Sequence, residues 1–202
     1  MSKKIAFNVT FFAALVLIFF LVISKLIPGF AKSRIPPIGY VQPFHFTTQD
    51  GKSFTNKDVA GKVFVAEYFF TTCKGICPRL NNNMRLVYDR FKNEKDFLIL
   101  SHTCNPETDS AARLKQYADS MKVSTDRWIF LTGPKDSLYY QARLSYHIDD
   151  PKNNLRSIDE DFLHTQFFAL VNAKGEVKKI YDGLKQSEVE DMIGDISKLL
   201  NR

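Results

Sequence analysis

Two cysteines four positions apart carry the most specific chemical signal in this sequence. Cys73 and Cys77 lie in the segment 72–78, TCKGICP, and the proline that ends this segment favours the first turn of a helix. We therefore expect both thiols at a helix amino terminus, where the helix dipole and free N–H groups favour thiolate. Such a spacing lets the two sulfurs form a disulfide or bind one soft metal ion. A bridge over so short a loop adds little stability, so the pair predicts redox or metal chemistry.

The elements that must position these cysteines alternate between strands and helices. Apolar, β-branched and aromatic residues predict buried strands at 63–70, 97–101 and 128–131. Helices are expected over 78–91, 106–121, 134–146 and 187–200, with a hairpin over 166–181 before the last one. An Asp-Gly turn within 49–52 predicts a further hairpin ahead of the first strand. This order indicates an α/β, thioredoxin-like fold with an N-terminal hairpin extension.

A third ligand would distinguish a metal site from a redox-active cysteine pair. His164 comes just before the predicted strand at 166–171. In a sheet of the thioredoxin type this strand adjoins the cysteine-bearing helix, so the imidazole can reach both sulfurs. Two thiolates and an imidazole suit Cu(I) and can also hold Cu(II), whereas zinc usually takes a closed tetrahedral set. Taken alone, a histidine beside a strand is more often packed or solvent-facing than a ligand.

Two further residues lie near the predicted site. His102 and Cys104 are two positions apart at the end of the strand at 97–101, so we expect them on one face, directed toward the cysteine loop. A third thiol there can resolve a mixed disulfide or lend a fourth metal ligand. A free cysteine is more often a small apolar filler, and this interpretation is the leading one for Cys104. His45 and His147 are interpreted as incidental.

The amino terminus predicts a membrane anchor. The uncharged stretch from Ile5 to Ser24 covers the bilayer core of about 30 Å at about 1.5 Å per residue. It is longer than the apolar part of a cleaved signal peptide, and 24–28 offers no small-x-small cleavage site. We expect one uncleaved transmembrane helix, with residues 5–27 as the anchor. The short amino-terminal tail favours an inside amino terminus, so the rest faces the periplasm or the equivalent extracytoplasmic space.

Charge and composition divide the chain in the same way. Residues 1–40 hold five of the 28 Lys and Arg and no acid, which leaves 23 bases against 22 acids in the rest. The net charge of +6 therefore reports a basic tail, and we exclude a nucleic-acid partner. Four prolines between 28 and 43 predict a semi-extended spacer. We expect an anchor at 1–27, a linker at 28–40 and a folded domain at 41–202.

Four segments in order resemble the SCO/SenC family of thioredoxin-fold copper proteins, which assist cytochrome c oxidase assembly. They are the CxxxCP signature at 73–78 after an aromatic strand, NPETD at 105–109, WIFLTG at 128–133 and the His-Thr pair at 164–165. The resemblance covers about residues 38–200. It implies that Cys73, Cys77 and His164 bind copper, and that the partner is a cytochrome c oxidase subunit or another copper protein.

The sequence departs from the family pattern at positions that are usually acidic or proline. Lys74 and Gly75 stand where family members have Pro and an acid, Leu163 where Asp often precedes the histidine, and Asn105 where DPxxD begins with an acid. The loss of three acids removes negative charge that would help to hold Cu(II). We therefore expect the binding of Cu(II) to be weakened more than the binding of Cu(I).

Two functions from different classes stay open on the sequence alone. The first is a membrane-tethered copper chaperone that passes copper to an oxidase subunit by ligand exchange, which is not enzymatic. The second is a thiol-disulfide oxidoreductase, in which Cys73 attacks and Cys77 resolves, keeping the copper-ligand cysteines of a partner reduced. Lys74 and the missing acids favour the second slightly. A thiol peroxidase fits less well, because its reactive cysteine usually lies in a different local pattern.

Overall fold

The described residues, 3–26, 36–150, 163 and 165–201, divide into two units between Pro36 and Pro37 in this computed structural model. The first unit contains α1 (Lys3–Leu26). Its stretch Lys4–Leu26 has a mean hydropathy of 2.7 in its most apolar window, and none of that window is buried. The helix is long and apolar enough to cross a membrane, as the sequence predicts.

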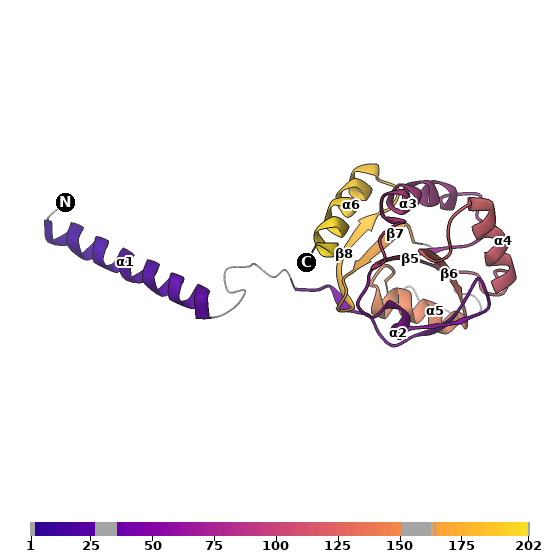
Figure 1. Ribbon diagram of the computed structural model, residues 1–202, viewed down its shortest axis with the longest axis horizontal. Coiled ribbons are helices and arrows are strands. Elements are labelled where there is room, and N and C mark those ends of the chain that lie inside the picture. The colour runs from indigo at the N-terminus through magenta and orange to yellow at the C-terminus, as the bar shows by residue number, and fades with distance from the viewer. Residues whose placement is uncertain (1–2, 27–35, 151–162, 164, 202) are drawn as a thin grey trace. The chain divides into compact units, whose positions relative to one another are not determined.

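The second unit is built on one mixed sheet (Figure 1). Its strands are β1 (Gly39–Tyr40), β2 (His45–Thr48), β3 (Ser53–Thr55), β4 (Val63–Phe69), β5 (Phe97–Thr103), β6 (Trp128–Thr132), β7 (Phe167–Val171) and β8 (Glu176–Asp182). They lie in the order β1-β8-β7-β4-β5-β6-β2-β3. β4 pairs in parallel with β5, and β5 with β6, whereas β7 is antiparallel to both β4 and β8.

Helices cover both faces of this sheet. They are α2 (Asn56–Val59), α3 (Cys77–Phe91), α4 (Ala111–Met121), α5 (Lys135–Tyr140) with the π-helical turn η1 (Gln141–Ser145), and α6 (Gln186–Leu200). α3, α4 and α6 pack on one face through Leu80, Leu114 and Val189. α2, α5 and η1 pack on the other face through residues such as Val59 and Leu138, together with apolar side chains of the edge hairpin β2–β3. Every residue of β4 and β5 is buried, as expected for parallel strands between two helical layers.

The expected elements are present, with differences at their ends. The hairpin across 49–52 forms with Gly51 at φ +74, and the second hairpin joins β7 to β8. Gly39 and Tyr40, which the sequence assigned to the linker, pair with Val177 and Glu176 as the edge strand β1. The helix expected from 134 to 146 is α5 followed by the π turn η1.

The helix expected to begin at 106 begins at Ala111. Thr108 N and Asp109 N both donate to Asn105 O, which forms a turn, and Ser110 then caps α4 by accepting from Arg113 N. The turn is fixed because the buried Asp109 carboxylate accepts hydrogen bonds from outside the helix. A tertiary contact therefore overrides the helical pattern of this segment.

Candidate functional site

The sheet register brings three separate segments to one edge. β4 ends at Phe69, which is opposite Thr103 of the parallel strand β5, and Cys104 N donates to Phe69 O at 2.7 Å. β7 runs antiparallel to β4, so its amino end lies beside the carboxyl end of β4. The cysteine loop, the residue after β5 and the segment before β7 therefore meet at this edge, as the sequence predicts for the strand that follows His164.

A cavity of about 530 Å³ opens where these segments meet. All three cysteines of the chain line it, together with Leu163, Thr165, Tyr68, Phe69, Phe70, Thr72, Lys74, Gly75 and Ile76. His164 lies outside the described residues, but its two neighbours in sequence both line the cavity. No carboxylate is present among these lining residues.

The two cysteines of the loop have different environments. Cys73 is half-buried, and this burial alone would raise the pKa of its thiol. Its sulfur accepts hydrogen bonds from the Cys77 thiol and from the backbone N–H groups of Gly75, Ile76 and Cys77. These hydrogen bonds outweigh the burial, so the pKa of Cys73 is lowered. Cys77 is 4 % exposed, and burial together with its hydrogen bond to Cys73 raises its pKa to about 12. The pair therefore combines an accessible thiol whose pKa is lowered with a sheltered thiol whose pKa is raised.

The third thiol, Cys104, is 3 % exposed, and burial raises its pKa well above the ordinary value. It shares the cavity with Cys73 and Cys77. In the part of the chain that the structure describes, however, no three Cys, His, Asp or Glu side chains are grouped closely enough to hold a metal ion. Among the described residues, the three sulfurs therefore do not form a metal-ligand set by themselves.

His102 does not reach the cavity, contrary to the sequence expectation. Its ring is fully buried, stacks on Tyr68 with centroids 4.9 Å apart, and meets the edge of Phe46 at 5.4 Å. Burial lowers the pKa of this imidazole to about 3. His102 is thus a neutral core residue on the face of the sheet against which α5 and η1 pack.

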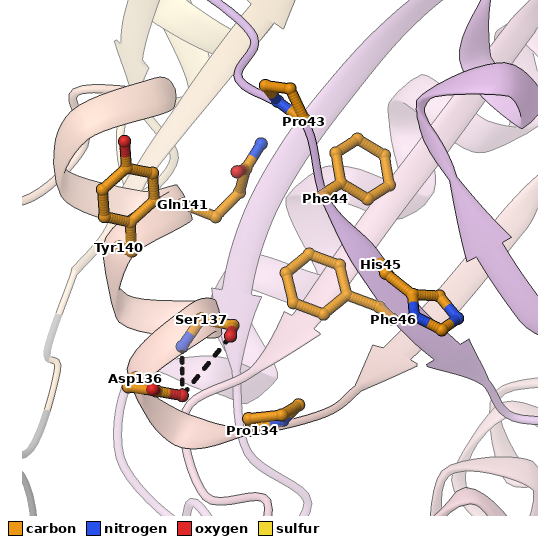
Figure 2. Close-up of a pocket in the computed structure, with 9 residues that line it drawn as sticks. All are labelled: Pro43, Phe44, His45, Phe46, Pro134, Asp136, Ser137, Tyr140 and Gln141. Atoms are coloured by element: carbon orange, nitrogen blue, oxygen red, sulfur yellow. Dashed lines mark hydrogen bonds between the residues drawn. The ribbon is translucent and has the colours of Figure 1, made fainter.

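A second cavity of similar size lies between the β2 strand and α5, and Figure 2 shows its lining. Asp136 there accepts hydrogen bonds from the backbone N–H and hydroxyl of Ser137, and His45 hydrogen-bonds to Ser53 at 2.8 Å. The described lining contains no cysteine. The thiol-lined cavity is therefore the better candidate for chemistry.

Two buried acids support the site and were not assigned a role from the sequence. The Asp109 carboxylate accepts from Thr71 N at 3.0 Å, from Thr71 Oγ1 at 2.5 Å and from Thr103 Oγ1 at 2.6 Å. It therefore ties the start of the cysteine loop to the end of β5. The signal available in the sequence was the last acid of the NPETD segment.

Glu67 is the second buried acid. It is 1 % exposed in β4 and accepts a hydrogen bond from Ser101 Oγ at 2.5 Å, while Trp128 Nε1 donates to Ser101 at 2.7 Å. Burial raises the pKa of Glu67 to about 7, and its charge contributes to the raised pKa of Cys77. A single acid inside an otherwise apolar strand segment was the signal for this residue.

The fold and the paired thiols define a class: thioredoxin-like domains with two cysteines where a buried strand leads into a helix. The family model described as SCO1/SenC matches residues 34–201, and the chain belongs to this family. The chain is 32 % identical over 165 residues to the "SCO1 protein homolog" of Bacillus subtilis, which covers 79 % of this chain and 83 % of that protein.

Solved structures agree with this assignment. The chain is similar to the structure of BsSco, at a TM-score of 0.68 and 31 % identity, and the match covers 81 % of this chain and 95 % of that one. BsSco is described as having a disulfide switch and as a member of the Sco family of cytochrome c oxidase assembly proteins. It is also similar to yeast Sco1 with copper bound, at a TM-score of 0.58 and 25 % identity over 79 % of this chain and 89 % of that one. The thioredoxin-like fold predicted from the sequence is confirmed.

Proposed function

We propose that this protein is a membrane-tethered copper carrier that delivers copper to a cytochrome c oxidase subunit or another copper protein. The observation that carries the proposal is the cavity at the sheet edge, which is lined by Cys73 and Cys77 together with the two residues that flank His164. The family and the copper-bound relative support the metal. Copper is here the cargo of the protein.

The donor set fits a soft ion. In the proposal Cys73 and Cys77 bind copper as thiolates, Cys77 releases its proton on binding, and His164 supplies the nitrogen ligand. Sulfur ligands favour Cu(I), and the described lining residues offer no carboxylate to stabilise Cu(II). We therefore infer that Cu(I) is held more tightly than Cu(II).

Delivery needs an accessible ligand and a position at the membrane. Cys73 is the most exposed of the three thiols, so a cysteine of the partner can displace it first in a ligand exchange. Residues 5–27 form the proposed anchor, with the folded unit on the periplasmic side or in the equivalent extracytoplasmic space. The anchor would keep the carrier close to a membrane-bound oxidase.

A second function is favoured by the difference between the two thiols. An accessible Cys73 with a lowered pKa and a buried Cys77 with a raised pKa match the attacking and resolving thiols of an oxidoreductase. Cys73 would attack a disulfide of the partner and form a mixed disulfide, and Cys77 would then release the reduced partner. The Cys73–Cys77 pair is oxidised to a disulfide in this exchange.

A competition titration of the reduced full chain in detergent, with Cu(I) and a chromogenic chelator, tests the first function. We expect one tightly bound equivalent, at least about tenfold weaker binding in His164→Ala, and unchanged binding in Cys104→Ser and in the control His45→Ala. Weak Cu(I) binding, or binding that is the same in His164→Ala as in the wild type, would contradict the copper-carrier function. The reduction potential of the Cys73–Cys77 pair would then test the second function.

A further inference from the structure

Tyr139 of α5 joins two of the segments that meet at the cavity. Its side chain is 1 % exposed. The phenol Oη donates to the carbonyl oxygen of Cys104 at 2.9 Å and accepts from the backbone N–H of Leu163 at 3.1 Å. One hydroxyl therefore connects the end of β5 to the residue that precedes His164.

Both partners of this phenol line the thiol cavity and are buried, with Cys104 at 3 % and Leu163 at 1 % exposure. A buried backbone N–H or carbonyl without a partner costs free energy, so the phenol satisfies one group on each segment. The aromatic ring is also held in place, since the Arg143 guanidinium lies 5.3 Å and the Lys135 ammonium 5.6 Å from its centroid.

A second contact fixes the backbone on the other side of His164. Thr165 Oγ1 donates to the carbonyl oxygen of Ile148 at 2.7 Å and accepts from Phe167 N at 3.2 Å. The residues before and after His164 are thus both anchored to the segment 139–148, which comprises the end of α5, η1 and the residues just after it.

We propose that Tyr139 is a positioning residue for His164, holding the backbone at Leu163 against the end of β5 so that the imidazole is presented to the copper. The inference rests on the proposed copper function. A ligand presented by an anchored backbone loses less conformational freedom when the metal binds. Residues that orient a metal ligand typically change metal affinity by about 10- to 100-fold when they are replaced.

The test is a double-mutant cycle on the full chain in detergent, with Cu(I) affinity as the readout. Tyr139→Phe keeps the ring and its cation contacts and removes only the hydroxyl. Tyr140→Phe is the matched control, because the neighbouring tyrosine is 50 % exposed. Each is measured alone and together with His164→Ala, and thermal unfolding is recorded for every variant.

We expect Tyr139→Phe to weaken Cu(I) binding at least about tenfold, and to change it less than about twofold when His164 is already alanine. Tyr140→Phe should have no effect in either background. An equal loss in both backgrounds would show a general structural effect, and no loss at all would show no role, so either result overturns the proposal while the copper function stands. If His164→Ala leaves copper binding unchanged, both the positioning role of Tyr139 and the proposed copper function are overturned.

A second measurement does not depend on the folding of a variant. Hydrogen exchange of the copper-loaded wild-type chain should show a protected Leu163 amide. Exchange of this amide at the rate of an exposed loop would overturn the proposal, because the hydrogen bond to Tyr139 would then not hold the backbone.

Discussion

The three thiols line one cavity but differ in exposure and in pKa. The lowered pKa of Cys73 and its partial exposure predict that it reacts first with iodoacetamide near neutral pH. Cys77 and Cys104, both buried with raised pKa values, should react far more slowly. Peptide mass spectrometry after short exposure of the reduced native chain measures the order. Modification of Cys104 ahead of Cys73 would contradict this account of the site.

Glu67 gives a prediction about pH. Burial raises its folded-state pKa to about 7 from 4.5, so between these values the native chain keeps a proton that the unfolded chain has lost. The contribution of Glu67 to the free energy of unfolding therefore falls by about 1.4 kcal/mol for each pH unit from about 4.5 to 7, or about 3 kcal/mol in all.

Glu67→Gln removes this titration. The free energy of unfolding of the variant, minus that of the wild type, should rise across the same pH interval by about 3 kcal/mol and then stay level. Denaturant unfolding at several pH values measures this difference, with the exposed Glu94→Gln as a control that should show no such rise. A difference that stays constant with pH would show that Glu67 is ionised throughout.

Among the elements, the contact between the cysteine loop and the turn before α4 carries the clearest prediction. Asp109→Asn replaces one carboxylate oxygen with an amide donor that faces the Thr71 N–H or one of the two threonine hydroxyls. Hydrogen bonds to charged groups are worth about 2 kcal/mol, so we expect a loss of at least this size in the free energy of unfolding and weaker Cu(I) binding. Asp89→Asn, at an exposed position of α3, is the control. Equal stability of both variants would contradict the role of Asp109.

The elements also show what the sequence could predict. The β4 strand, the cysteine loop and α3 were predictable because a continuous apolar segment, a proline and an amphipathic segment are local signals. The start of α4 was not, because the acid that fixes the preceding turn bonds to Thr71, 38 residues earlier. His102 was misplaced for a related reason: the alternation of a strand gives its face, but its partners Tyr68 and Phe46 come from other strands.

In the candidate site, too, residues with a local sequence signal were predictable, and residues that act through distant contacts were not. Cys73 and Cys77 could be predicted from their spacing, and the sheet order then brings the segment beside His164 to them. Tyr139, Asp109 and Glu67 act through contacts between distant segments, and residue types alone do not show which polar side chain lies behind a site.

At the scale of the whole molecule, the chain combines an apolar helix with a folded unit that begins at Pro37. We predict that the full chain stays with the membrane fraction during an alkaline carbonate wash, because an apolar span of this length is stably inserted. A chain that lacks residues 1–27 should appear in the soluble fraction. Release of the full chain by carbonate would contradict the anchor.

X-ray absorption spectroscopy of the Cu(I)-loaded full chain tests the proposed copper site directly. We expect two sulfurs and one nitrogen bound to copper in the wild type, one sulfur fewer in Cys77→Ser, and loss of the nitrogen with both sulfurs kept in His164→Ala. A copper environment that is the same in the wild type and in His164→Ala, or one with no sulfur, would contradict it.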